Sequence, residues 1–240
     1  MAQVIVALDM PSAAEALELV DRLGDRGDFY KVGLELYTRA GPDVVAQLVS
    51  RDKRVFLDLK LHDIPNTVAG AVRAASELRV DLLTVHGSGG RAMLEAAAGS
   101  VVGDLRLLGV TVLTSLTSSE MSEVWGRRIE SVGDEVARLV ELAQQTGMHG
   151  VVASPLEASS IRARVGGQFL IVTPGIRPAG ADRGDQTRVA TPADATRAGA
   201  DYLVVGRVVT RAADPLAALA AVQVEVRAAA EENDLNALTG

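Results

Sequence analysis

Short apolar segments alternate with longer helical segments along the chain, and this alternation constrains the fold more than any other feature. The first four apolar segments begin about 25 residues apart, the length of one strand–helix unit. Nearly continuous apolar strands are typical of a parallel sheet that is covered on both faces. The predicted strands begin near Gln3, Asp28, Arg54, Asp81, Arg106, Gly150, Phe169 and Asp201.

Each predicted strand is followed by a segment of helical periodicity. These segments span residues 12–23, 36–50, 67–78, 90–98, 134–146, 155–165, 191–198 and 215–230. Such repetition within 240 residues predicts an α/β protein with the (β/α)8 TIM barrel fold. A doubly wound open sheet is the alternative, but Asp9-Met10-Pro11-Ser12 stands where that fold usually carries a glycine-rich fingerprint. No linker divides the chain, so we expect a single domain over residues 1–240, with residues 231–240 as a polar tail.

The composition narrows the class of protein. A hydrophobic content of 48% provides a large core, and the net charge of −7 argues against general binding to nucleic acid. The chain has no Cys, which excludes disulfides and cysteine nucleophiles and fits a reducing cytoplasm. The apolar run at the N-terminus is too short for a signal peptide or membrane span, so we expect a cytoplasmic protein without a membrane partner.

Polar residues gather where the predicted strands end. In a TIM barrel these positions meet at the carboxyl-terminal face, where the active sites of this fold are built. Polar residues without a shared role would not favour one end of eight strands, so this placement indicates an enzyme. The positions are Asp9, Lys31, Asp58, Lys60, His86, residues 114–117, residues 174–177, Gly206 and Arg207.

The third predicted strand ends in a charged cluster. Side chains alternate between the faces of a strand, so Asp58 and Lys60 share one face and point into the space that the strand encloses. With Lys31 and Asp63 they form two ammonium–carboxylate pairs, whose alternating signs favour the ionised forms. A fixed ammonium can stabilise developing negative charge and donate a proton. The charged cluster has two other interpretations: a structural salt bridge, and a Mg²⁺ site with Asp9, Asp58 and Asp63 as ligands.

The loops after the last two strands predict a phosphate site. Gly175-Ile176-Arg177-Pro178 opens a polar loop that runs through Gln186, and Gly206-Arg207 ends the last strand. These two loops are the customary phosphate cradle of TIM barrels. A glycine lets backbone amides approach the anion, and an arginine supplies a forked cation. An ordinary turn with surface arginines is the alternative.

The stretch Asp58-Leu-Lys-Leu-His-Asp-Ile-Pro-Asn-Thr67 resembles the signature of the orotidine 5′-phosphate decarboxylase family. Weaker matches lie at Ala7-Leu8-Asp9, Tyr30-Lys31-Val32-Gly33, Leu113-Thr114-Ser115, Thr173 to Arg177 and Val205-Gly206-Arg207, so the resemblance covers most of the chain. It implies a homodimer of (β/α)8 barrels that converts orotidine 5′-phosphate to UMP and CO2 without a cofactor.

The resemblance also implies roles for individual residues. Lys60 would protonate C6 of the pyrimidine, with Asp58 near the leaving carboxylate and Lys31 between Asp58 and the ribose. Asp63 and Thr67 would enter the site of the neighbouring subunit. The remaining substrate contacts would come from Asp9 at the ribose, Thr117 at the pyrimidine, and Arg177, Gln186, Gly206 and Arg207 at or beside the phosphate.

Two other functions compete with this one. A related barrel enzyme acting on keto-sugar phosphates carries a similar Asp-x-Lys-x-x-Asp pattern but depends on Mg²⁺ and an enediolate, so metal dependence would separate the two. A non-catalytic barrel that senses UMP is the second alternative. Binding alone needs only a phosphate site, however, and leaves the array of lysines and aspartates unexplained.

Overall fold

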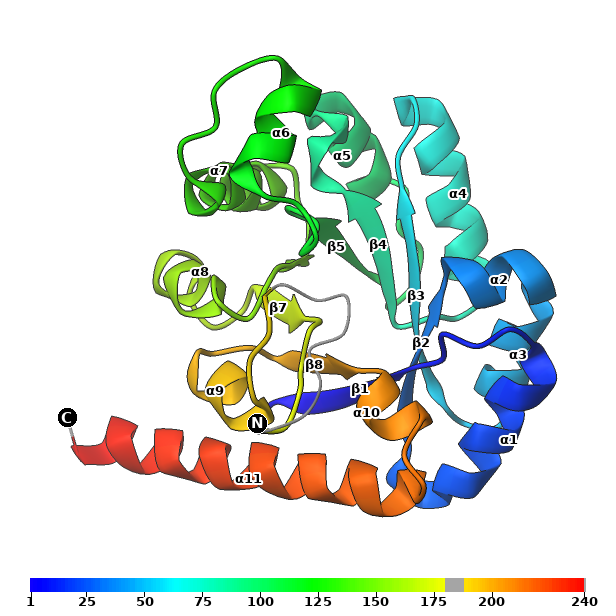
Figure 1. Ribbon diagram of the computed structural model, residues 1–240. Coiled ribbons are helices and arrows are strands. Elements are labelled where there is room, and N and C mark those ends of the chain that lie inside the picture. The colour runs from blue at the N-terminus through cyan, green and yellow to red at the C-terminus, as the bar shows by residue number, and fades with distance from the viewer. Residues whose placement is uncertain (180–187, 240) are drawn as a thin grey trace.

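The predicted strands form a closed barrel in the computed structural model, which describes residues 1–179 and 188–239 (Figure 1). In this part of the chain eight parallel strands pair in chain order, and the last pairs with the first. Each strand starts within one residue of its predicted start, and the (β/α)8 TIM barrel is confirmed. The strands are β1 (Gln3–Ala7), β2 (Phe29–Gly33), β3 (Arg54–Leu61), β4 (Leu82–His86), β5 (Arg106–Val110), β6 (Gly150–Val152), β7 (Leu170–Thr173) and β8 (Tyr202–Val205).

Helices surround the barrel, as Figure 1 shows. They are α1 (Ala13–Leu23), α2 (Leu34–Ala40), α3 (Asp43–Val49), α4 (Pro65–Glu77), α5 (Arg91–Ala98), α6 (Ser118–Trp125), α7 (Val132–Gln145), α8 (Ala158–Val165), α9 (Pro192–Arg197), α10 (Arg207–Thr210) and α11 (Pro215–Thr239), with 3-10 turns η1 (Gly24–Arg26) and η2 (Gly87–Gly89).

Two differences from the predicted helices have local causes. Residues 36–50 form two helices rather than one, because Gly41 adopts a positive φ of 63° and Pro42 follows it. Helix α6 was not predicted. Its start carries a capping box, in which Thr117 and Glu120 each hydrogen-bond to the other's backbone, and this pattern could have revealed it.

The core has two layers. Side chains such as Ile5, Phe29, Phe56 and Leu108 fill the barrel interior, and a larger apolar layer separates the strands from the helices. Phe56 lies in the interior, so Asp58, two residues later on β3, also faces inward. The charged carboxyl end of β3 therefore lies next to the apolar side chains that fill the barrel interior.

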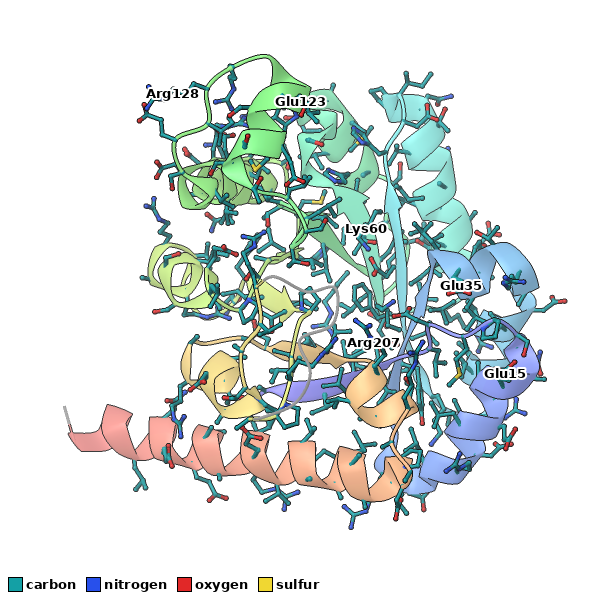
Figure 2. All side chains as sticks on the ribbon, in the orientation of Figure 1. Glu15, Glu35, Lys60, Glu123, Arg128 and Arg207 are labelled. Atoms are coloured by element: carbon teal, nitrogen blue, oxygen red, sulfur yellow. The ribbon has the colours of Figure 1, made fainter. Side chains whose placement is uncertain are left out.

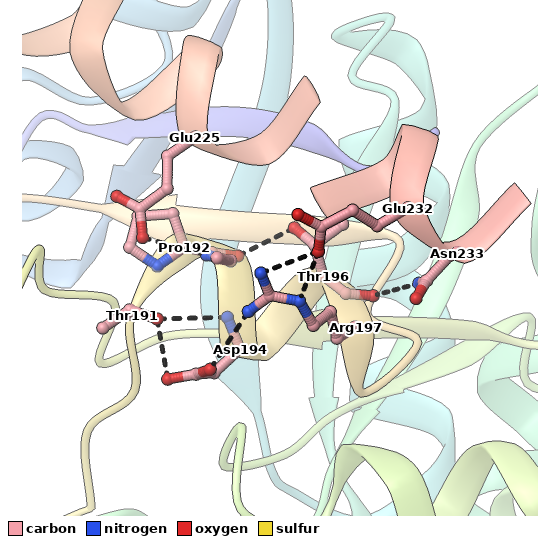
Figure 3. Close-up of polar contacts among 9 residues, drawn as sticks. Thr191, Pro192, Asp194, Thr196, Arg197, Glu225, Glu232 and Asn233 are labelled. Atoms are coloured by element: carbon pink, nitrogen blue, oxygen red, sulfur yellow. Dashed lines mark hydrogen bonds and ion pairs between the residues drawn. The ribbon is translucent and has the colours of Figure 1, made fainter. Parts of the chain in front are cut away.

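The segment that we predicted as a polar tail is helical as far as Thr239, because α11 continues to that residue. Beyond residue 230 it is held against α9 by polar contacts, as Figure 3 shows. Glu232 accepts two hydrogen bonds from Arg197, and Asn233 donates to the carbonyl of Thr196. Although α11 is 25 residues long, neither it nor any other described helix is apolar enough to span a membrane.

Candidate active site

A cavity of about 470 Å³ lies at the carboxyl ends of the strands. Figure 2 shows Lys60 and Arg207 toward the middle of the molecule, whereas Glu123 and Arg128 lie at its rim. Most of the residues predicted for a site line this cavity. They are Asp9, Lys31, Asp58, Lys60, Arg177, Gly206 and Arg207.

Four charged side chains form a continuous array on one wall of the cavity. The Nζ atom of Lys31 lies 2.8 Å from Oδ1 of Asp9 and 3.7 Å from Oδ2 of Asp58. The Nζ atom of Lys60 lies 2.9 Å from each oxygen of Asp58. The order Asp9–Lys31–Asp58–Lys60 therefore alternates negative and positive charge. The sequence predicted such alternation for Lys31, Asp58, Lys60 and Asp63, and Asp9 stands in the place expected for Asp63.

Asp58 is the centre of this array. Its side chain is 13% exposed. Burial opposes ionisation, but the charges of Lys31 and Lys60 and hydrogen bonds from Lys60 and Thr84 outweigh it, so the pKa of Asp58 lies below its usual value. A fixed negative charge therefore faces the cavity at neutral pH, and it holds the Lys60 ammonium in place.

The backbone at Lys60 is unusual. Its φ is +49°, in the left-handed region that residues with a side chain rarely adopt, and the β3–β4 register shifts between Leu57 and Leu61. The hydroxyl of Thr84 accepts a hydrogen bond from the Lys60 amide at 2.8 Å and donates one to Asp58 at 3.0 Å. Thr84 is fully buried on β4, and sequence reasoning missed it.

Asp63 and Thr67 lie outside the array. They line a separate pocket of about 330 Å³, which Lys60 and His62 also border. Oδ1 of Asp63 accepts a hydrogen bond from the amide of Ile64 at 2.6 Å rather than reaching the lysines of its own chain. Within one chain, Asp63 therefore does not join Lys31, Asp58 and Lys60 as we predicted. Asp9 is the second carboxylate of the array instead.

The donor set does not match the Mg²⁺ alternative. Lys31 already bridges Asp9 and Asp58, and Asp63 is committed to its neighbouring amide. Across residues 1–179 and 188–239, no three His, Asp or Glu side chains converge as a ligand set for a metal ion.

The loops after β7 and β8 supply cations to the cavity. Arg177 and Arg207 line it together with Thr210 and Arg211, two residues that the sequence reasoning did not single out. Gly206 stands at the start of α10, where a Cβ atom would approach only Ala7, at 3.8 Å. Gln186 lies outside the described residues.

The remaining predicted positions have other surroundings. Thr117 caps α6, and its hydroxyl lies 2.7 Å from Oε2 of Glu120, so it does not line the cavity; Thr114 does. His86 stacks on His62 with ring centroids 5.1 Å apart. Its Nδ1 atom lies 2.7 Å from the hydroxyl of Ser88.

The chain is similar to known proteins over nearly its whole length. The family model described as "Orotidine 5′-phosphate decarboxylase / HUMPS family" matches residues 2–222. A protein of Moorella thermoacetica named orotidine 5′-phosphate decarboxylase is 51% identical over 93% of this chain and 92% of its own length. One of the same name from Halorhodospira halophila is 52% identical over 95% and 97%.

Solved structures agree with these relatives. The crystal structure of orotidine 5′-phosphate decarboxylase from Lactobacillus acidophilus superimposes with a TM-score of 0.84 at 37% identity, covering 94% of this chain and 99% of that one. The match therefore extends over the whole barrel, including the charged end of β3. The chain belongs to the orotidine 5′-phosphate decarboxylase / HUMPS family.

Proposed function

We propose that this chain is a carboxy-lyase that converts orotidine 5′-phosphate to UMP and CO2, the last step of de novo pyrimidine synthesis, without a cofactor. The observation that carries the proposal is the Asp9–Lys31–Asp58–Lys60 array inside a nucleotide-sized cavity. The names of the relatives support the same reaction.

Lys60 is the central group of the mechanism. Breaking the bond between C6 and the carboxyl carbon releases CO2 and leaves the electron pair on C6, in an orbital that the pyrimidine π-system cannot delocalise. A preorganised positive charge stabilises that carbanion, and the Lys60 ammonium is held for this purpose by both oxygens of Asp58. Lys60 then transfers a proton from Nζ to C6, and solvent restores the ammonium.

Asp58 and Lys31 prepare the site for the substrate. The buried charge of Asp58 lies beside the position of the substrate carboxylate and disfavours it by like-charge repulsion, which eases the loss of CO2. Lys31 links Asp58 to Asp9, and this contact supports a role for Asp9 in accepting hydrogen bonds from the ribose hydroxyls.

We assign the phosphate end of the substrate to the part of the cavity that the arginines line. Arg177, Gly206 and Arg207 are assigned to the phosphate or its immediate surroundings, together with Gln186. Thr114 is the better placed hydroxyl for the pyrimidine, since Thr117 would have to leave its capping box to reach the ring. Phosphate binding far from C6 contributes to turnover by ordering the site.

The complete enzyme is a homodimer in this proposal. Asp63 and Thr67 border a pocket next to Lys60, and neither belongs to the array of its own chain. Ile64 between them is 68% exposed, which suits a surface that a second copy covers. Each subunit then lends Asp63 and Thr67 to the site of its partner.

The proposed reaction also indicates where the protein acts and what it binds. We assign the protein to the cytoplasm, with a nucleotide as its ligand and no nucleic acid or membrane partner. The cationic residues Arg177 and Arg207 lie at the cavity, while the chain as a whole carries a net charge of −7.

Loss of orotidine 5′-phosphate absorbance in the presence of EDTA tests the function directly. We expect the native chain to consume this substrate and release equal amounts of UMP and CO2, with no change on adding Mg²⁺. A folded protein that leaves orotidine 5′-phosphate intact would contradict the proposal. Turnover of a keto-sugar phosphate that needs Mg²⁺ would support the alternative enzyme instead.

A further inference from the structure

Arg188 joins three loops at one side of the cavity. Its Nη1 atom lies 2.6 Å from Oε1 of Glu157, which follows β6, and its Nη2 atom donates to the carbonyl of Leu113, which follows β5, at 3.1 Å. Arg188 itself follows β7. The two charged side chains are only 14% and 13% exposed.

The ion pair between Arg188 and Glu157 is a poor source of stability. Oε2 of Glu157 and Nε of Arg188 are buried, with no hydrogen-bond partner among the described residues. Burial raises the pKa of Glu157 above its usual value, although Arg188 and Ser154 oppose this. Buried ion pairs whose desolvation exceeds their attraction do not stabilise a fold relative to neutral residues, so a positional role is the better explanation.

The atoms that Arg188 holds belong to the cavity wall. Leu113 and Thr114 line the cavity, and the Leu113 carbonyl also accepts a hydrogen bond from the amide of Leu116. Two residues after Arg188, the carbonyl of Ala190 accepts a hydrogen bond from the amide of Arg177 at 2.9 Å. Arg188 thus connects the wall that carries Thr114 to the segment that carries Arg177.

We infer that Arg188 and Glu157 are positioning residues, which hold the Leu113–Thr114 wall at the distance from Arg177 that a bound nucleotide requires. Neither side chain is placed on the substrate. The inference rests on the proposed function for its kinetic consequence, because misplacing a substrate-contacting wall lowers the rate of a reaction that depends on alignment.

Three variants and one matched control test this inference. Arg188→Ala removes both bonds, Arg188→Lys keeps a cation but cannot hold both acceptors, and Glu157→Gln keeps the shape while removing the charge. Arg162→Ala is the control, because Nη2 of Arg162 lies 2.6 Å from Oδ2 of Asp201 at the opposite end of the strands. The readouts are kcat and KM for orotidine 5′-phosphate, the thermal unfolding midpoint, and hydrogen exchange at the Leu116 amide.

The expected pattern separates position from stability. Arg188→Ala lowers kcat/KM by at least about tenfold, and added guanidinium restores part of the loss. Arg188→Lys gives an intermediate value, and Glu157→Gln loses kcat/KM without a lower unfolding midpoint. Exchange at Leu116 accelerates in Arg188→Ala and not in Arg162→Ala. The control lowers the unfolding midpoint and leaves kcat/KM within about twofold.

Two results would overturn the inference. One is native kcat/KM in Arg188→Ala alongside a lower unfolding midpoint, which would make the pair merely structural. The other is unchanged exchange at Leu116, which is readable even if the native chain has no decarboxylase activity. A native chain without turnover would instead refute the proposed function, so the two failures are distinguishable. If Arg188→Ala does not fold, Arg188→Lys and Glu157→Gln give the same comparison.

Discussion

The ammonium of Lys60 lies 2.9 Å from both oxygens of Asp58, although only one residue separates them on β3. A regular strand would place the two side chains parallel on one face, but the left-handed φ of Lys60 turns its backbone at this point. That conformation costs about 1–3 kcal/mol for a residue with a side chain. The surrounding hydrogen bonds stabilise it, so the strain is located at the proposed proton donor.

Gly33 leaves room for the side chain of Lys31, because glycine has no Cβ atom. A Cβ atom at this position would lie 2.7 Å from Nζ of Lys31, closer than real Cβ contacts come, and 3.1 Å from Oδ1 of Asp9, a tight contact. We predict that Gly33→Ala displaces the Lys31 ammonium and lowers kcat/KM about tenfold or more, with little change in the unfolding midpoint.

Gly167→Ala is the matched control for Gly33→Ala, because nothing lies within 4 Å of its Cβ position and its φ is not positive. It should leave steady-state kinetics unchanged. Equal kinetic parameters for the two variants would refute the steric role of Gly33.

Thr84 supports the backbone of Lys60. We predict that Thr84→Val, which keeps the shape but removes the hydroxyl, lowers kcat and destabilises the fold by about 1–3 kcal/mol, because the partly buried Lys60 amide and Asp58 each lose a partner. Urea unfolding and steady-state kinetics measure the two effects. Thr196→Val removes a buried hydroxyl that donates to Pro192 in α9, so it should affect stability alone. A normal kcat in Thr84→Val would show that the hydroxyl does not position Lys60.

Hybrid dimers test whether Asp63 acts across a subunit interface. Lys60→Ala and Asp63→Ala should each be nearly inactive alone, since each removes a group from every site. In a random mixture half of the dimers are hybrids, and one of the two sites in each hybrid is intact. Activity should therefore recover to about a quarter of the native value. Native mass spectrometry verifies the hybrids, and no recovery in their presence would place Asp63 in its own subunit's site.

We predict that His86, which stacks on His62, makes the stability of the fold depend on pH. Burial, together with the charges of His62 and Lys60, lowers the pKa of His86 below its usual 6.5. The unfolded chain thus binds more protons just below pH 6.5, so this residue's contribution to stability is present above pH 6.5 and is lost as the pH falls through its folded pKa.

NMR titration of the His86 ring should show a midpoint below 6.5, and His86→Asn should weaken the fall in the unfolding midpoint between about pH 7 and 5. The partners that face His86 are His62, Lys60 and Ser88. A normal titration midpoint for His86, or an unchanged pH slope in His86→Asn, would refute this account.

The strands could be predicted closely because each is a continuous apolar run that both barrel layers require. The ends of the helices could be predicted less closely than the strands. Gly41-Pro42 splits a segment whose periodicity continues, and α11 runs past residue 230 because Glu232 and Asn233 find partners on α9, which no local pattern reveals.

Some residues of the site could likewise be predicted from the sequence, and others could not. Asp9, Lys31, Asp58 and Lys60 could be predicted, because strand ends and a specific decapeptide identify them. Thr84 and Arg188 could not, since their partners lie on other strands or loops and depend on register. Nor does a strand pattern predict the left-handed backbone at Lys60, which follows from the register shift between β3 and β4.

The most direct test of the account is orotidine 5′-phosphate consumption in EDTA by the native chain, Lys60→Ala and Lys53→Ala. Lys53 is a suitable control because its ammonium donates to the exposed Gly24 carbonyl, away from the cavity. We predict equal rates for the native chain and Lys53→Ala, and a loss of at least about a thousandfold in Lys60→Ala. Undiminished turnover in Lys60→Ala would contradict the assignment of Lys60 as the stabilising charge and proton donor.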